Sequence, residues 1–353
     1  MRLARNAQIW FPGYARTSLR AFRAPLPERI WVAIADHFEP LWNGADERTG
    51  AERVRAWTRA WPGIASGFLD SSGRRPRYTF FYAQEQYRPA LVEPLAAMAE
   101  SGIADVEVHL HHDGEGEQDF VDRISSFTET LHSRHGLLRR EGGRLAFAFI
   151  HGDWALDNSG RDGRHCGLNN EIDLLVRLGC YADFTMPSAP DVSQARLVNT
   201  IYWAVDDPLQ PKSHDTGVPV TPGSVKPPGA LLMIPGPLGI RWRGWLDGDH
   251  WHPRLETGEL ASYDLPAPGR VRVWRDTAPR IGGDMFLKLF THGAPERNAN
   301  ALLSGGLARA FELLLNAASA AGQRIYFVSA WEMKNAVENA RAHQTSRPAL
   351  KAG

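Results

Sequence analysis

Short apolar runs, rich in β-branched and aromatic residues, alternate along the chain with longer stretches of helical periodicity. The runs predict strands at Ile30–Ala35, Tyr78–Tyr82, Val106–Leu110, Leu145–Ile150, Asp183–Met186, Val271–Trp274, Phe286–Phe290 and Arg324–Val328. The helical patterns cover Ala51–Phe68, Pro89–Ser101, Glu117–His135, Glu171–Leu178, Ala299–Ala321 and Ala330–Ala342. This alternation predicts an α/β fold with a largely parallel sheet. With about seven or eight strands, a distorted (β/α) barrel competes with an open doubly wound sheet.

The rhythm breaks at residues 202–280, which are rich in Pro, Gly and Trp. We interpret this segment as a β-rich insertion with hairpin strands around Leu231–Ile234, Ile240–Leu246 and Arg270–Trp274. The chain then divides into a basic N-terminal extension at 1–29, one domain at 30–345 that contains the insertion, and a frayed tail at 346–353.

Composition and charge exclude several classes of protein. The 353 residues include 40 Lys and Arg against 40 Asp and Glu, so no net charge favours binding to nucleic acid. No apolar run approaches the ~20 residues of a membrane span, and the N-terminal segment has no apolar core of a secretory signal. The two cysteines, Cys166 and Cys180, are too few for a disulfide scaffold. We therefore expect a cytoplasmic protein; its oligomeric state is left open.

Histidines and acidic residues gather where the predicted strands end. Asp36 and His37 follow the first strand, and His292 follows the strand at Phe286–Phe290. The other strand-end residues are His109, His111, His112, His151 and Asp153. Because parallel α/β folds place their sites at the carboxyl ends of strands, these positions predict a functional site there.

The strand around Val106–Leu110 predicts a metal site. Glu107, His109 and His111 alternate along it and share one face, with about 7 Å between the Cα atoms of successive members. Two imidazoles at this spacing can converge on one divalent ion, most plausibly Zn²⁺, with Asp36 supplying a carboxylate. The alternative is a cluster of hydrogen-bonded surface histidines.

Two further segments carry candidate chemistry. Lys288 and His292 share a face of their strand. The imidazole of His292 can act as a general acid. The ammonium of Lys288 lies within the strand, where burial is costly unless a carboxylate pairs with it. In His151-Gly-Asp153-Trp154 an indole can cover a sugar ring while polar groups bind its hydroxyls. Core packing or capping is the alternative for each.

The order of these motifs resembles the polysaccharide deacetylase superfamily, the NodB-homology group of carbohydrate esterases. The matching segments are Ile34-Ala-Asp36-His37, Tyr78-Thr-Phe-Phe-Tyr82, Glu107-Val-His-Leu-His111, Lys288-Leu-Phe-Thr-His292 and Tyr326-Phe-Val-Ser-Ala-Trp-Glu-Met333. The resemblance implies a distorted, often seven-stranded (β/α) barrel, a metal held by one Asp and two His, a second Asp as base, and a last-motif histidine that protonates the leaving group. The chain departs from the family pattern, because Glu115 stands four residues after His111 and His37 replaces the second acidic residue. It is similar to divergent members associated with surface-polysaccharide biosynthesis.

The leading hypothesis is a metal-dependent hydrolase that removes an acetyl or similar acyl group from an N- or O-acylated sugar. Asp36 is the predicted base or ligand, His292 the general acid, and His37, His109 and His111 the remaining ligands. The predicted substrate-binding residues are His151, Asp153, Trp154 and Lys288. His112 and Glu115 stay open as replacement ligands. The alternatives are a non-catalytic carbohydrate-binding or scaffold protein and a metal-dependent hydrolase of small amides.

Overall fold

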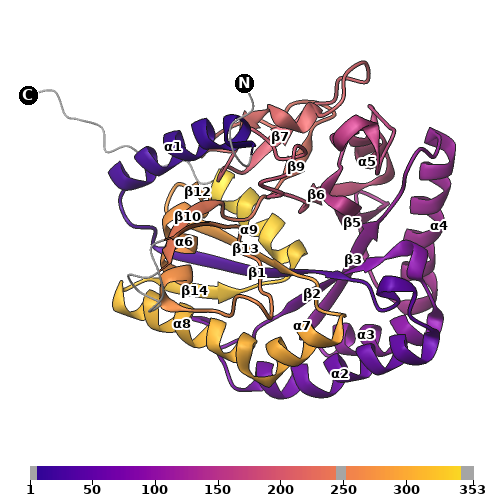
Figure 1. The fold of residues 1–353 in the computed structure, drawn as a ribbon, viewed down its shortest axis with the longest axis horizontal. Helices are drawn as coiled ribbons and strands as arrows, with labels where there is room; N and C mark the ends of the chain where they lie inside the picture. The colour runs from indigo at the N-terminus through magenta and orange to yellow at the C-terminus, as the bar shows by residue number, and fades with distance from the viewer. Residues whose placement is uncertain (1–5, 244–251, 343–353) are drawn as a thin grey trace, which may run out of the picture.

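A largely parallel sheet forms the centre of the computed structural model, which describes residues 6–243 and 252–342 (Figure 1). Its parallel strands run in the order β13-β1-β2-β3-β5-β6-β9, and β14 pairs with the first half of β1. Their bounds are β1 Arg29–Phe38, β2 Tyr78–Ala83, β3 Ala104–Leu110, β5 Arg144–His151, β6 Cys180–Asp183, β9 Leu231–Met233, β13 Asp284–Thr291 and β14 Arg324–Phe327. The predicted α/β fold with a largely parallel sheet is confirmed.

Short antiparallel strands add to this sheet: β12, β7 and β8 at its ends and β4 beside the start of β5. Their bounds are β4 Arg139–Glu141, β7 Tyr202–Ala204, β8 Val218–Pro219 and β12 Arg280–Ile281. Within the described residues no ladder joins β13 to β6 or β9, so hydrogen bonds between strands do not close the sheet into a barrel. A side-chain hydrogen bond connects β13 with the segment after β6: Lys288 Nζ donates to Phe184 O at 2.7 Å.

Helices cover both faces of the sheet. Their bounds are α1 Ala7–Arg23, α2 Glu47–Ser66, α3 Pro89–Glu100, α4 Glu117–His135, α5 Glu171–Leu178, α6 Pro268–Thr277, α7 Glu296–Ala301, α8 Leu307–Ala320 and α9 Ala330–Ala342. Figure 1 shows α2 and α3 along one side of the sheet and α4 beside β3 and β5. None of the helices in the described ranges is long and apolar enough to cross a membrane.

Alternation along the strands divides the buried side chains between the two faces. On β1, Val32 and Ile34 belong to the larger core with residues of α2, α3, α4, α5 and α8. Ala33 and Ala35 belong to the second core, together with Met333 and other residues of α9. Helix α9 therefore covers the face of β1 to which its odd-numbered residues point.

Several predicted elements match closely and others need correction. The helices at Glu117–His135, Glu171–Leu178 and Ala330–Ala342 are confirmed. The strand predicted at Val271–Trp274 is wrong, because this segment lies in α6, which begins at Pro268 and buries Val271 and Trp274 at helical spacing. The predicted strand Asp183–Met186 is β6 at Cys180–Asp183, which ends where that prediction begins.

The segment predicted as a β-rich insertion contributes to two sheets. β7, β8 and β9 belong to the central sheet, whereas β10 (Gly239–Arg243) and β11 (His252–Glu256) form a separate antiparallel pair. The segment 1–29, predicted as a basic extension, contains α1, whose Trp10 is buried in a small core with Val198 and Leu238. The predicted tail at 346–353 lies outside the described residues.

Candidate metal centre

Three histidines from neighbouring strands meet at the carboxyl edge of the sheet. β1 carries His37, β3 carries His109, and His292 directly follows β13. The register of β1 and β13 pairs Asp36 with Thr291, so the next residues, His37 and His292, lie side by side with ring centroids 4.7 Å apart. The rings of His37 and His109 are 5.2 Å apart. The structure thus brings together three of the residues predicted from the sequence.

Glu39, His109 and His111, which we call the first group, each offer a possible ligand atom within 4.8 Å of the others. His109 and His111 point the same way because they are two residues apart. Glu39 Oε1 lies 3.7 Å from His109 Nε2, which is too long for a hydrogen bond but suits two ligands of one ion. Two imidazoles and a carboxylate can hold a divalent transition-metal ion.

Neighbouring acceptors fix the orientation of both imidazoles in the first group. His109 Nδ1 lies 2.9 Å from Ile150 O, which can only accept, so Nδ1 carries the proton. His109 Nε2 is buried and has no hydrogen-bond partner among the described residues. His111 Nδ1 lies 2.7 Å from Glu85 Oε1. A carbonyl or carboxylate on the second nitrogen is the usual support for a metal-binding histidine.

Burial and nearby charges set the pKa values around the first group. Burial, together with the neighbouring His292, holds the pKa of His37 well below its ordinary value. Burial raises the pKa of Glu39, but the interaction with His109 outweighs it and the net shift is downward. Burial lowers the pKa of His111, but Glu85 outweighs it and the net shift is upward. At neutral pH His37 is therefore neutral and the Glu39 carboxylate is ionised.

Asp36 points to the opposite face of β1 from His37. Its carboxylate accepts hydrogen bonds from Gly293 N at 2.6 Å and from the Tyr78 hydroxyl at 2.9 Å. Burial raises the pKa of Asp36 to about 8, although both hydrogen bonds oppose the shift. A Cβ atom at Gly293 would lie 2.1 Å from Asp36 Oδ2, so the carboxylate fills the space beneath the turn after β13.

Asp36 was predicted as a metal ligand and base, and the structure does not bring it together with His109 and His111. Glu39 provides the carboxylate there instead, because it lies two residues after His37 and falls on the same side of the chain. Glu107, which the sequence places on the same face as His109 and His111, accepts hydrogen bonds from Ala148 N and the Tyr181 hydroxyl.

The loop after β5 brings Trp154 to the histidines. The indole lies 6.4 Å from the ring of His37 and 6.0 Å from that of His292, measured between centroids. Asp153, predicted to bind substrate beside it, is half exposed and lies 3.2 Å from His165 Nδ1. Trp154 therefore forms a wall of the histidine site.

Lys288 and His292 lie at different depths of the site. The Lys288 ammonium is fully buried, 5.3 Å from the ring centroid of Phe290. Burial lowers the pKa of Lys288 to about 7, and the charge of Asp183 opposes this shift, but among the described residues Lys288 forms no ion pair of the kind predicted. The His292 side chain is 29% exposed, and its Nδ1 lies 4.0 Å from Glu259 Oε1. Burial lowers the pKa of His292.

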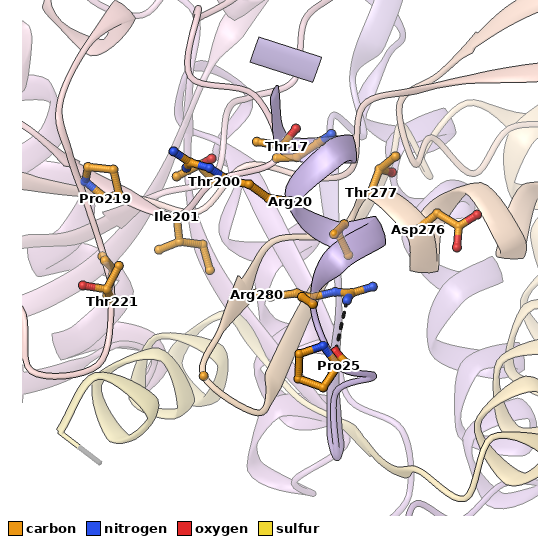
Figure 2. A pocket seen from close by; sticks show the side chains of 16 residues that line it. Thr17, Arg20, Pro25, Thr200, Ile201, Pro219, Thr221, Asp276, Thr277 and Arg280 are labelled. Carbon is orange, nitrogen blue, oxygen red and sulfur yellow. Dashed lines mark hydrogen bonds between the residues drawn. The ribbon is translucent and has the colours of Figure 1, made fainter. Parts of the chain in front are cut away.

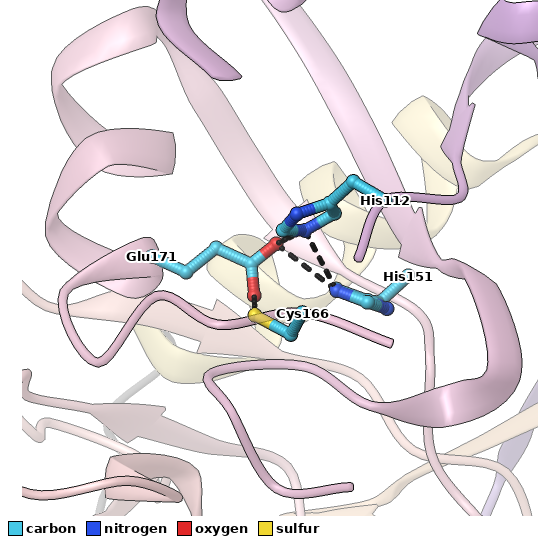
Figure 3. A group of neighbouring side chains, drawn as sticks. All are labelled: His112, His151, Cys166 and Glu171. Atoms are coloured by element: carbon cyan, nitrogen blue, oxygen red, sulfur yellow. Dashed lines mark hydrogen bonds and ion pairs between the residues drawn. The ribbon is translucent and has the colours of Figure 1, made fainter. Parts of the chain in front are cut away.

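A second group consists of His112, His151, Cys166 and Glu171, all buried, with possible ligand atoms within 4.8 Å of one another (Figure 3). The Nε2 atoms of His112 and His151 are 2.9 Å apart. Glu171 Oε1 lies 3.2 Å from His112 Nε2 and 3.4 Å from His151 Nε2, and Glu171 Oε2 lies 3.4 Å from Cys166 Sγ. This group can hold a metal ion as well.

The second group contains two residues for which the sequence suggested other roles. His151 was predicted to bind substrate, yet it is fully buried against His112 and Glu171. Burial lowers the pKa of His151 to about 4, against the charge of Glu171. His112 was left open as a ligand for the first group and points to the second. Glu115, the other open ligand, pairs with Arg123 at 2.7 Å.

Four residues were not predicted from the sequence: Glu39, Cys166 and Glu171, which belong to the two groups, and Glu85, which contacts His111. For Glu39 a signal existed, since the alternation that joins His109 to His111 also joins His37 to Glu39. Glu85 is the second residue after β2, at the same sheet edge. Cys166 and Glu171 reach His112 through an irregular loop, and no periodicity in the sequence encodes that contact.

A separate pocket of about 290 Å³ lies beside α1 (Figure 2). Residues of α1, including Thr17 and Arg20, form one part of its lining, and Pro219, Asp276 and Arg280 contribute to the rest. None of its lining residues belongs to the first or the second group. The chemistry of the histidines is therefore independent of this pocket.

No family model matches the chain, and no curated protein matches it.

Proposed function

We propose that this protein is a metal-dependent hydrolase that removes an acetyl or similar acyl group from an N- or O-acylated sugar. One observation carries the proposal: the first group offers two imidazoles and a carboxylate, with His109 Nε2 buried and unpartnered among the described residues. The order of the strand-end motifs, with its resemblance to polysaccharide deacetylases, supports the acyl-sugar substrate. In this proposal the curved sheet is a distorted (β/α) barrel.

Glu39, His109 and His111 would hold the divalent ion, which we take to be Zn²⁺ from the donor types. His37 is the proposed fourth ligand, since its buried Nε2 has no partner among the described residues and its ring adjoins that of His109. When bound, the ion would polarise the acyl carbonyl and acidify a water molecule. Asp36 has no ligand role in this proposal and supports the turn that carries His292.

His292 is the proposed proton-transfer residue. Its neutral imidazole can accept the proton of the attacking water and then pass it to the leaving amine or alcohol. Glu259, 4.0 Å from Nδ1, would stabilise the intervening imidazolium. His292 thus gives up within one turnover the proton that it takes from water, so no second residue is needed to protonate the leaving group.

Trp154 and Asp153 are the proposed sugar-binding residues. The indole stands beside His292, where its face can pack on a sugar ring as the acyl group reaches the imidazoles. The half-exposed Asp153 carboxylate can accept hydrogen bonds from sugar hydroxyls. The buried Lys288 donates to Phe184 O and has no sugar-binding role in this proposal, and His151 belongs to the second group.

The test combines metal analysis with a screen for acyl release from N-acetyl sugars, O-acetyl sugars and small amides. We expect His109→Ala and Glu39→Gln to lower sugar deacylation by more than about 100-fold and to remove the ion of the first group. His135→Ala is the matched control, because His135 contacts Tyr87 at the end of α4. Full activity in His109→Ala would refute the proposal. Sugar binding without turnover or metal would favour the scaffold alternative, and turnover of small amides alone would favour the amide hydrolase.

A further inference from the structure

We propose that His112, His151, Cys166 and Glu171 bind a structural zinc ion that fastens the loop between β5 and α5 to the sheet. This second group is distinct from the first group, on which the proposed hydrolysis rests. His112 follows β3, His151 ends β5, Cys166 lies in the loop and Glu171 begins α5. One ion would therefore join four segments of the chain.

The donor atoms converge slightly more closely than the ligand atoms of a tetrahedral zinc site, with two of the three measured distances below the tetrahedral range. Zn–N and Zn–O bonds of about 2.0–2.2 Å place neighbouring ligand atoms ~3.3–3.6 Å apart in a tetrahedron. The three distances among His112 Nε2, His151 Nε2 and Glu171 Oε1 are 2.9, 3.2 and 3.4 Å. The Cys166 thiol approaches the same carboxylate and completes a set of two imidazoles, one thiolate and one carboxylate, which are zinc ligands.

Hydrogen bonds alone do not satisfy this arrangement. His151 Nδ1 lies 2.5 Å from Gly152 O and carries the proton for that bond, which leaves a lone pair on Nε2. A proton on His112 Nε2 can point to His151 or to Glu171, but not to both along straight bonds. The contact between His151 Nε2 and Glu171 Oε1, at 3.4 Å, then has a lone pair on both atoms and no proton between them, and all these side chains are buried. A cation at the centre removes this conflict.

The charge of Glu171 also favours a cation, because a single backbone donor, Asp157 N at 2.6 Å from Oε2, and the two imidazoles face it among the described residues. Its carboxylate is fully buried, and in the described part of the chain its ion-pair partners are the imidazoles of His112 and His151. These two imidazoles face each other through Nε2 at 2.9 Å, so both cannot be protonated there. At most one of the two imidazoles can therefore carry a positive charge. Burying the Glu171 carboxylate beside a single imidazolium and a neutral imidazole nitrogen costs free energy, and a divalent ion between them would offset that cost.

The surroundings of Cys166 suit a thiolate ligand. Its sulfur accepts a hydrogen bond from Asn158 N at 3.2 Å and one from Leu168 N at 3.4 Å. Backbone donors on a ligand atom are the outer-shell support that metal sites share. Both thiols donate to a backbone carbonyl, Cys166 to Leu168 O and Cys180 to Ala182 O, but among the described hydrogen bonds Cys180 has no backbone N–H donor on its sulfur.

The burial of all four side chains assigns a structural role. A closed site with no open coordination position binds its ion permanently, whereas a catalytic site keeps one position for water or substrate. The loop it would hold is irregular: six of the eleven described non-glycine residues with positive φ fall between 153 and 165. Such backbone costs about 1 kcal/mol or more per residue and persists only when surrounding contacts fix it. The same loop carries Trp154 to His37 and His292.

The experiment uses the full chain produced with Co²⁺ in place of zinc. A cobalt ion bound by a thiolate gives a charge-transfer absorption in the near ultraviolet, and the first group contains no cysteine. We expect this absorption in the wild-type protein, its loss in Cys166→Ser, and its retention in the matched control Cys180→Ser. Zinc-grown Cys166→Ser should lose about one ion per chain relative to the control.

An absent absorption in the wild-type protein, or an absorption retained in Cys166→Ser, would overturn the second site. If Cys166→Ser does not fold, Cys180→Ser decides, because an absorption in that variant can come only from Cys166. His109→Ala should keep the absorption while it loses the ion of the first group. The two sites thus fail separately: the absorption reports the zinc proposal, and acyl release reports the proposed hydrolase.

Discussion

His111 and His112 are consecutive residues whose imidazoles belong to different groups. His111 points to Glu39 and His109, whereas His112 points to Cys166 and Glu171 on the other face. Because successive side chains in extended chain alternate, one dipeptide can supply both sites. The two groups are therefore joined through the backbone at the end of β3, with no shared ligand.

Single substitutions of the two histidines should separate activity from stability. His111→Gln should abolish acyl release and change the free energy of unfolding little, since this side chain is 30% exposed. His112→Gln should lower the free energy of unfolding by about 2–4 kcal/mol, because it disrupts a fully buried polar network. Denaturant unfolding monitored by circular dichroism, beside an acyl-release assay, measures both. Equal losses of stability in the two variants would contradict the separation.

Glu85 should tune metal affinity without binding the ion. Its carboxylate holds His111 Nδ1 at 2.7 Å, so Glu85→Gln removes the charge that fixes this imidazole. We expect the dissociation constant of the first group for Zn²⁺ to rise about 10–100-fold. Calorimetric titration of metal-free protein measures it, with Glu47→Gln as the control, because Glu47 pairs with Arg88 on the surface. An unchanged zinc affinity in Glu85→Gln would show that Glu85 does not support metal binding through His111.

Gly152 packs against the ring of His111, and this contact permits no side chain. A Cβ atom at position 152 would lie 2.2 Å from His111 Cδ2 and 2.9 Å from His111 Cα. Gly152→Ala should therefore displace the imidazole, weaken metal binding at the first group, and cost about 1–3 kcal/mol of stability.

Gly63 provides the control for this prediction. It lies in α2 with open space around its Cα, so Gly63→Ala should stabilise the protein by about 0.5–1 kcal/mol. Thermal unfolding and zinc titration of both variants test the contrast. If Gly152→Ala kept the wild-type zinc affinity and stability, the His111 ring would have moved aside without cost, and the prediction would be wrong.

The sequence predicted much of the framework because its signals are local. The helices at Glu117–His135, Glu171–Leu178 and Ala330–Ala342 follow from apolar periodicity and terminal residues. The meeting of His37, His109 and His292 follows from a general property of parallel sheets, whose carboxyl ends share one edge. Trp154 was also found, because the loop that carries it leaves from that edge.

The features that the sequence analysis did not single out have equally specific causes. Glu39 was not considered beside Asp36, although the alternation of β1 places Glu39 with His37 and Asp36 on the opposite face. The second group depends on an irregular loop, whose path is set by tertiary contacts such as that of Gly114 N with Cys166 O at 2.8 Å. Residue spacing carries no record of such contacts, so the sequence could not reveal that Cys166 lies beside His112, His151 and Glu171.

Lys288 should make the stability of the protein depend on pH. Burial lowers the pKa of Lys288 from 10.5 to about 7 in the folded chain, whereas the unfolded chain keeps the ordinary value. Between about pH 7 and pH 10.5 the unfolded state therefore binds the additional proton, and the free energy of unfolding rises with pH by at most about 1.4 kcal/mol per unit. Lys288→Met lacks this contribution and leaves Phe184 O without its donor at every pH. The stability of the wild-type protein relative to Lys288→Met should consequently increase from pH 7 to pH 9. Urea unfolding at both pH values measures the difference, with Lys226→Met as the matched control because Lys226 is exposed. A difference that stays constant would mean that the Lys288 ammonium remains protonated in the folded protein, with Asp183 as its ionised partner.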